Sequence, residues 1–420
     1  MNLLQEPQQF ELLSRRLLLR QALLSAAGLP LLGAPSHLLA ATTQWPTKIW
    51  PTATPQSVGM DAAKLAAFDA EIASGQFGYV NSLLVIRHGK AIYDRTYKHD
   101  YDKIYGKEAK ETGALNPLNH GGPYNYFNPW WHPFYRRGDL HTMQSVTKTV
   151  TSVVIGVATA RKEFPALDTP ILKFFDEAQV AQVDERKRRV TLRHLLTMTA
   201  GLEWHENDLP YNDPKNSCTI MEASFDWVKF AIDQPMSEEP GTRFNYNSGA
   251  TQLLSHIFRV ATGHDIEEYA ARHLFTPLGI ETWFWKRTPT GLADTEGGLY
   301  LRRHDLAKIA YLFLKNGNWE GKQLVTAKWV KESVTPSIAV SANGVKYGLK
   351  WWLHPYGPND ARLVWAGSGF GGQFPIIVPD YDLIIVANGW NILDGKHLST
   401  RTLVDRMLGA IRNPIPGKAR

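Results

Sequence analysis

The sequence contains a single cysteine, Cys218, so no disulfide can form within the chain. It also lacks a long hydrophobic run: the apolar stretch near the N-terminus covers ~14 residues and holds prolines, whereas a membrane-spanning helix needs ~20. No phosphate-binding loop, dinucleotide fingerprint or repeat of fixed period occurs. We therefore predict no stable membrane anchor and no cofactor.

Neither positive nor negative charge is concentrated in one part of the chain. The net charge of +6 is spread along the chain, and basic clusters such as ERKRR (185–189) are short. A solvated helix end explains that cluster better than nucleic-acid binding does, because no recognition module accompanies it. The Gly-x-Ser-x-Gly signature of α/β-hydrolases is missing, and His205 has no second histidine four residues later. We predict no nucleic-acid partner and no metal site.

The first residues have the order of an export signal: basic SRRLLLR, then apolar LLSAAGLPLLGAP, then small residues up to Ala40 and Ala41. The adjacent Arg15 and Arg16 resemble a twin-arginine signal. We expect residues 1–41 to be a cleavable signal, the twin-arginine export machinery to be a partner, and the protein to be periplasmic. An amphipathic N-terminal helix is the other interpretation.

Residue patterns predict an α+β fold for residues 42–420. NSLLVIRHGKAIYDRTY indicates a hairpin around His88, and the C-terminal part holds strand-like segments such as GQFPIIVP and DLIIVANGW. Helical periodicity dominates between them. We predict an antiparallel sheet built from both chain ends and flanked by helices, with an inserted, mainly helical subdomain at about 150–290.

Residues 98–140 are rich in aromatic residues, Asn, Pro and Gly, which predicts a packed loop close to the functional site. Trp130, Trp131 and Tyr135 are candidate walls of a pocket there. Glu206 and Asp208 could bind an amine-bearing substrate, although a solvated acidic loop also explains them.

Three sequence elements carry chemistry. Ser145 and Lys148 in MQSVTKTV stand one helical turn apart, so the amine can contact the hydroxyl and take its proton when neutral. Tyr246 precedes a small, polar loop that opens an apolar helix. The glycine-rich VWAGSGFGGQFPIIVP allows a substrate close to the backbone, whose free N–H groups can form an oxyanion hole. Each element alone has an ordinary structural explanation.

Together and in this order, the elements resemble the serine β-lactamase and penicillin-binding-protein superfamily, in the branch of class C β-lactamases and related esterases. QSVTKTVTS, FNYNSG and GFGGQ are most similar to 6-aminohexanoate-dimer hydrolase and its carboxylesterase-like relatives. The resemblance implies a β-lactamase/transpeptidase-like fold, with Ser145 as nucleophile, Lys148 as the activating lysine and Tyr246 as the catalytic tyrosine. It implies an oxyanion hole made by the backbone N–H groups of Ser145 and Phe370.

Two departures from the family pattern concern the substrate. The family places asparagine two residues after the tyrosine, where this chain has Ser248, next to Asn247. The third motif begins with lysine or histidine in the family and with Gly367 here, which removes a cation that binds the carboxylate of β-lactams. The candidate substrate-binding residues are Gly367, Ser368, Gly369, Asn247 and Ser248.

The sequence thus favours a serine hydrolase that cleaves a small ester or amide through an acyl-enzyme on Ser145. Two alternatives stay open: a peptidoglycan-directed D-aminopeptidase, carboxypeptidase or weak β-lactamase, and a non-catalytic protein that binds cell-wall fragments. Lys148 is expected to be neutral at least part of the time.

Overall fold

The computed structural model describes residues 44–117, 121–393, 396 and 398–412. The predicted export signal, residues 1–41, lies outside them and stays a prediction. Among the described residues, no helix combines the length and the apolar character needed to cross a membrane. Residues from Gln44 onward form one compact unit.

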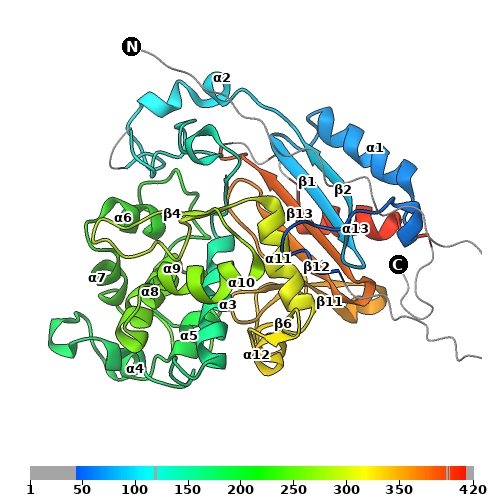
Figure 1. Cartoon of the computed structure of the whole chain (residues 1–420). Coiled ribbons are helices and arrows are strands. Elements are labelled where there is room, and N and C mark those ends of the chain that lie inside the picture. The colour runs from blue at the N-terminus through cyan, green and yellow to red at the C-terminus, as the bar shows by residue number, and fades with distance from the viewer. Residues whose placement is uncertain (1–43, 118–120, 394–395, 397, 413–420) are drawn as a thin grey trace, which may run out of the picture. The chain divides into compact units, whose positions relative to one another are not determined.

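An antiparallel sheet made from both ends of the chain organises this unit, as predicted (Figure 1). Its central strand β13 (Leu383–Gly389) pairs with β1 (Val80–Arg87) on one side and β12 (Phe374–Val378) on the other. The strand order is β2-β1-β13-β12-β11-β10-β9-β8. The remaining strands are β2 (Lys90–Thr96), β8 (Ile338–Ala339), β9 (Lys346–Tyr347), β10 (Trp352–Tyr356) and β11 (Arg362–Ala366).

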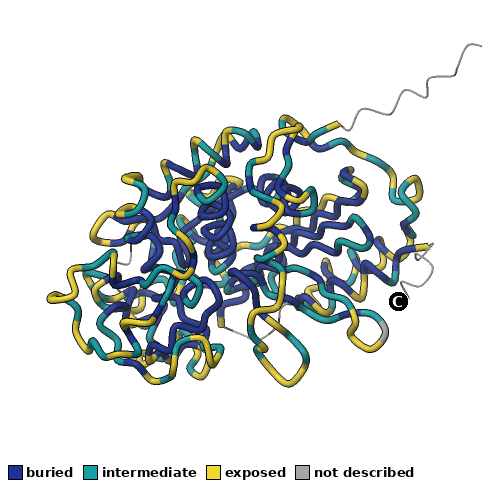
Figure 2. Tube along the Cα trace, turned by 90° about the horizontal axis from the view of Figure 1, so that it is seen from below, coloured by how far each residue is buried: buried dark blue, intermediate teal, exposed yellow. Residues whose placement is uncertain are grey.

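Helices cover both faces of this sheet, which explains why β1 is buried along its whole length. Alternate side chains of a strand point to opposite faces. Leu84 and Ile86 join the larger core with α11 (Arg303–Leu314), whereas Leu83 and Val85 join a second core with α1 (Ala62–Ala73) and α13 (Thr400–Gly409). Figure 2 shows this buried interior in dark blue. The apolar run LLVI is therefore a strand between two helical layers.

Local sequence explains how these elements begin and turn. Asp61 accepts hydrogen bonds from the first backbone N–H groups of α1, and Ser399 does the same for α13. His88 and Gly89 both have positive φ, as the tight turn between β1 and β2 requires.

A mainly helical insert between the hairpin and the C-terminal strands is also confirmed (Figure 1). Its longest helices are α3 (Val146–Ala160) and α8 (Ser248–Thr262), and most of their residues are buried. The others are α4 (Glu185–Arg188), α5 (Leu192–Leu196), α6 (Ser217–Ala223), α7 (Trp227–Ile232), α9 (Ile266–Ala270) and α10 (Thr276–Leu278), with α12 (Ala327–Ser333) following α11.

The described part of the aromatic segment is packed, as expected. It includes the short helix α2 (Tyr101–Tyr105), and Tyr101, Tyr105 and Tyr126 pack with Trp390 at the end of the sheet. The segment then leads into β3 (His141–Thr142), which pairs with β5 (Leu299–Leu301), itself the partner of β4 (Phe284–Trp285). Helix α3, which carries Lys148, begins just after β3.

His141, in β3, connects the segment that leads into α3 with the main sheet. Its Nε2 lies 3.1 Å from Asn81 Oδ1, at the start of β1, and its Nδ1 lies 2.8 Å from the carbonyl oxygen of Thr142. Burial lowers the pKa of His141 to about 4. The imidazole is therefore neutral in the folded protein at pH 5, where an unfolded histidine binds a proton.

We predict that His141 makes the protein less stable in mild acid. Because the folded pKa is depressed, the unfolded state gains the proton first as the pH falls below about 6.5, so the free energy of unfolding decreases by about 2 kcal/mol between pH 7 and pH 5. Urea unfolding of wild type and His141→Gln at both pH values measures this. The loss on acidification should be smaller in the variant by about that amount; equal losses would contradict the assignment.

Candidate active site

Ser145 stands immediately before α3, with Lys148 one turn into that helix. Lys148 Nζ donates a hydrogen bond to Ser145 Oγ at 2.9 Å, which is the contact predicted from their spacing. Gln144, the residue before Ser145, has φ of 47°, a left-handed conformation that is uncommon for a residue with a side chain. Such conformations cost about 1–3 kcal/mol and concentrate at functional sites.

Glu296, which the sequence reasoning did not single out, is the main partner of Lys148. Lys148 Nζ donates to the backbone oxygen of Glu296 at 2.7 Å and to its carboxylate Oε2 at 2.9 Å. The two side chains are only 2% and 5% exposed, so this is a buried ion pair. Asp294 shapes the loop, because its Oδ1 accepts hydrogen bonds from the N–H groups of Glu296 and Gly297.

The ion pair reverses the expectation that Lys148 has a lowered pKa. Burial alone would lower the pKa of Lys148, but its interactions with Tyr246 and with the Glu296 carboxylate, and to a smaller degree with Glu206, outweigh burial and raise the pKa well above its ordinary value. Lys148 is thus a cation in the resting protein. No local pattern in the sequence marks Glu296, because it lies 148 residues from Lys148 along the chain.

Tyr246 lies beside the pair. Lys148 Nζ is 5.2 Å from the centroid of the Tyr246 ring, and the ring stacks on Trp352 at 5.8 Å. Burial raises the pKa of Tyr246 to about 12, although the Lys148 charge and a hydrogen bond with Ser145 oppose this rise. Tyr246 is therefore a neutral phenol at pH 7, able to donate one proton.

Glu206 positions the segment that carries Tyr246. Its Oε2 accepts hydrogen bonds from Trp204 Nε1 at 2.6 Å and from the backbone N–H of Ser248 at 2.8 Å. Its Oε1 accepts from Ser248 Oγ and from the Tyr211 hydroxyl, both at 2.7 Å. Glu206 thus fixes the first turn of α8 rather than offering a free carboxylate to an amine. Asp208 is exposed and pairs with His205.

Asn247 and Ser248 take part in the same helix start. Asn247 Oδ1 accepts a hydrogen bond from Ala250 N at 2.7 Å and caps α8. Both side chains are buried. These contacts give the two residues a structural role, and their assignment to substrate binding stays a prediction.

The glycine-rich segment lies against the residues that precede Ser145. A Cβ at Gly369 would be only 2.5 Å from the backbone oxygen of Met143, so only glycine allows this approach. Gly369 N donates to Gln373 O, and Gln373 Nε2 donates to Phe370 O at 2.7 Å, which holds the turn. Within the described residues, the backbone N–H groups of Ser145 and Phe370 donate to no other protein group. They are thus free to serve as the predicted oxyanion donors.

Packing also explains why the cation of the third motif is missing. A Cβ at Gly367 would lie 2.9 Å from Pro375 Cγ and 3.3 Å from Val146 Cγ2, so a longer side chain does not fit there without movement. The neighbouring Ser368 is half-buried. Substrate binding by Gly367, Ser368 and Gly369 stays a prediction.

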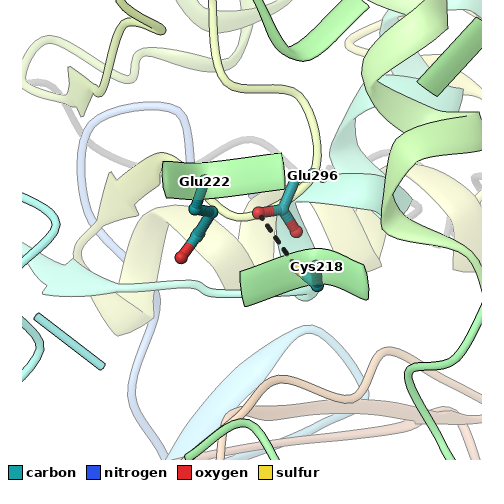
Figure 3. Close-up of side chains that lie close together, drawn as sticks. All are labelled: Cys218, Glu222 and Glu296. Atoms are coloured by element: carbon teal, nitrogen blue, oxygen red, sulfur yellow. Dashed lines mark hydrogen bonds between the residues drawn. The ribbon is translucent and has the colours of Figure 1, made fainter. Parts of the chain in front are cut away.

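A small cavity adjoins Ser145 on the side of Glu296. Cys218 and Glu222 of α6 lie next to Glu296 there, with Cys218 Sγ 3.9 Å from Glu296 Oε1 (Figure 3). Burial raises the pKa of Cys218 well above its ordinary value, which favours the neutral thiol over the reactive thiolate. The lining residues are Leu115, Tyr126, Gln144, Ser145, Tyr211, Cys218, Thr219, Glu222, Glu296 and Phe370.

The aromatic segment contributes Leu115 and Tyr126 to this cavity, so it does lie beside Ser145. Trp130, Trp131 and Tyr135 do not line this small cavity, and their assignment as walls of a substrate pocket stays a prediction. Trp131 packs against Phe284 and Tyr135, and Trp130 is exposed. Aromatic composition indicated the segment but not which of its residues face the site.

Comparison with known proteins assigns the family. Residues 78–390 match the family described as Beta-lactamase, and this range holds Ser145, Lys148, Tyr246 and Phe370. The chain belongs to the β-lactamase family. The relatives and structural neighbours of the chain include an esterase, an amidohydrolase and acyltransferases.

Among its relatives, monacolin J acid methylbutanoyltransferase of Aspergillus terreus is 30% identical over 28% of this chain and 28% of its own length. The chain thus spans little more than a quarter of that relative. The 6-aminohexanoate-dimer hydrolase of Paenarthrobacter ureafaciens is 24% identical over 63% of this chain and 71% of its own length. The crystal structure of a family VIII carboxylesterase shares the fold, with a TM-score of 0.58, 16% identity, and coverage of 86% of this chain and 98% of that one.

We predict that Glu206 stabilises the site through its four hydrogen bonds. Glu206→Ala leaves buried donors of Trp204, Tyr211 and Ser248 without an acceptor, so the free energy of unfolding should fall by about 3 kcal/mol or more. Asp208→Ala in the same loop is the matched control, and its exposed ion pair is worth less than about 1 kcal/mol. Urea unfolding followed by tryptophan fluorescence compares the two. Equally small losses in the two variants would show that the hydrogen bonds of Glu206 do not contribute to stability.

Proposed function

We propose that the protein hydrolyses small, linear ester or amide substrates through an acyl-enzyme on Ser145. The observation that carries the proposal is the hydrogen bond between Lys148 Nζ and Ser145 Oγ, 2.9 Å long, at the start of a buried helix. A serine hydroxyl is a weak nucleophile until a neighbouring group takes its proton. Family membership supports the same chemistry.

In acylation, Ser145 Oγ attacks the carbonyl carbon of the substrate. The oxyanion that forms would be bound by the backbone N–H groups of Ser145 and Phe370, and losing one such donor typically costs about 10²–10³ in rate. Lys148 is charged at rest, so it can accept the Ser145 proton only after giving up one of its own. The Glu296 carboxylate, 2.9 Å from Lys148 Nζ, is within reach of that proton.

Tyr246 would deliver the proton that the leaving group needs. As a neutral phenol hydrogen-bonded to Ser145, it can donate its proton to the departing alcohol or amine and recover one from the serine–lysine pair. An amine needs this proton more than a phenol does, because it is the poorer leaving group. Amide substrates should therefore depend on Tyr246 more than activated esters do.

Packing around Gly367 supports ester or amide substrates over β-lactams. No side chain fits at this position without movement, so the cation that the family uses for the carboxylate of β-lactams has no equivalent there. The structural neighbours include a D-stereospecific amidohydrolase and a family VIII carboxylesterase, which supports both bond types.

We predict that Ser145→Ala abolishes ester hydrolysis while leaving the fold intact. Turnover of p-nitrophenyl acetate and p-nitrophenyl butyrate should fall by on the order of 10⁴-fold or more, because no nucleophile remains. A fluorophosphonate probe should label wild type at Ser145 and fail to label the variant. Nitrocefin, assayed beside the esters, should be turned over far more slowly.

Two results would contradict this proposal. Wild type that is not labelled at Ser145 would favour the non-catalytic binding protein. Turnover of nitrocefin far above that of the esters would favour a β-lactamase or a peptidoglycan-directed enzyme.

We also propose export to the periplasm by the twin-arginine machinery, supported by Arg15 and Arg16 ahead of the apolar stretch. Replacing both arginines with lysine should retain the precursor in the cytoplasm of a bacterial host. Cell fractionation and the mass of the mature chain measure this. A mature chain that appears unchanged in the periplasm would contradict the twin-arginine route.

A further inference from the structure

The small cavity beside Ser145 has the size and lining of a water site. Its volume is ≈ 20 Å³, and a site needs about 10–15 Å³ of such space to hold one water. A buried water needs two to four polar partners. The lining supplies them through the side chains of Gln144, Ser145, Thr219, Glu222 and Glu296.

The two carboxyl groups of this cavity differ in charge. Burial and the neighbouring Glu296 charge raise the pKa of Glu222 well above its ordinary value, so Glu222 is protonated. The Tyr126 hydroxyl donates to Glu222 Oε1, and Glu222 and Glu296 lie close together, with carboxylate oxygens within 4.8 Å of each other. Burial raises the pKa of Glu296, but Lys148 outweighs this effect and leaves the pKa below its ordinary value. Glu296 is therefore the carboxylate of the pair that can accept a proton.

Glu296 also connects the cavity with the nucleophile. Its Oε2 is 2.9 Å from Lys148 Nζ, and that same Nζ is 2.9 Å from Ser145 Oγ. Its Oε1 faces Cys218, on the side of the cavity (Figure 3). One carboxylate thus lies within reach of both a bound water and the lysine that protonates Ser145.

We propose that this cavity binds the hydrolytic water, and that Glu296 is the catalytic base that deprotonates it to release the acyl group from Ser145. This role rests on the proposed function, because it requires an acyl-enzyme.

The step balances in protons and electrons. As the water oxygen bonds to the carbonyl carbon of the Ser145 ester, its proton passes to Glu296. The tetrahedral intermediate then collapses: the bond between that carbon and Ser145 Oγ breaks, the electron pair stays on Oγ, and Oγ takes a proton from Lys148. Glu296 returns its proton to the neutral lysine. One water is consumed, one carboxylic acid is released, and the ion pair is restored.

Glu296→Gln tests whether Glu296 acts as the base. Glutamine has nearly the same shape and still offers Lys148 an oxygen acceptor, but it cannot take a proton. With p-nitrophenyl acetate, the variant should still release about one p-nitrophenol per enzyme in a burst, because removing the Glu296 charge lowers the pKa of Lys148 and lets the neutral amine take the Ser145 proton directly. Its steady-state rate should then be about 10²–10⁴-fold below that of wild type. Intact mass should show the acetyl adduct on Ser145 accumulating in the variant.

Glu222→Gln is the matched variant in the same cavity. The substitution keeps the shape of the side chain and removes no base, so deacylation should slow by a few-fold only. Thr219→Leu tests the cavity independently of charge. Its larger side chain takes the space of the water, so the acyl-enzyme should again accumulate while the burst is retained. This variant decides the matter if Glu296→Gln does not fold, as judged by circular dichroism.

Three results would overturn the proposal. A burst rate and a steady-state rate that fall together in Glu296→Gln would mean that Glu296 acts only on Lys148. Deacylation at the wild-type rate in Glu296→Gln or in Thr219→Leu would mean that another base, or water from elsewhere, completes turnover. The absence of an adduct on Ser145 in wild type and in every variant would instead overturn the acyl-enzyme itself.

Discussion

The buried ion pair between Lys148 and Glu296 is the interaction on which the site depends. Taking two charges out of water costs several kcal/mol for each ion, and only close pairing with further hydrogen bonds offsets that cost. Lys148 meets this requirement through three acceptors, namely Ser145 Oγ and both the carboxylate and the backbone oxygen of Glu296. The pair thereby holds Lys148 against Ser145. Lys148 and Glu296 are also close enough to exchange a proton.

A steric constraint complements this electrostatic one. The glycine-rich segment can approach the backbone ahead of Ser145 only because Gly369 has no Cβ, and the crowding at Gly367 removes the place for a cation. The oxyanion donors and the loss of the usual carboxylate-binding residue thus follow from the same close packing. A substrate without a carboxylate at that position does not need the missing cation for binding.

The polar network at the start of α8 holds Tyr246 close to Lys148. Glu206 binds the first turn of the helix and two aromatic side chains, while Asn247 caps it. Ser248, which stands where the family pattern has asparagine, donates its hydroxyl to Glu206. The position of Tyr246 thus depends on residues that have a structural role.

Much of the fold could be read from the sequence because period-two and helical patterns report burial directly. The hairpin at His88, the C-terminal strands and the helical insert between them all follow from such patterns. The Ser145–Lys148 contact could also be predicted, since both residues lie within one helical turn. Glu296 could not, because it is 148 residues from Lys148 and pairs with it only when β5 is placed beside β3.

The sequence by itself determined the helix that carries Ser145 and Lys148, the glycines that allow close approach, and the tyrosine at the entrance of α8. Only the tertiary structure decided the charge of Lys148, the proton on Glu222 and the cavity between them. The physical reason is that local geometry depends on neighbours along the chain, whereas the pKa of a buried group depends on which distant charges surround it.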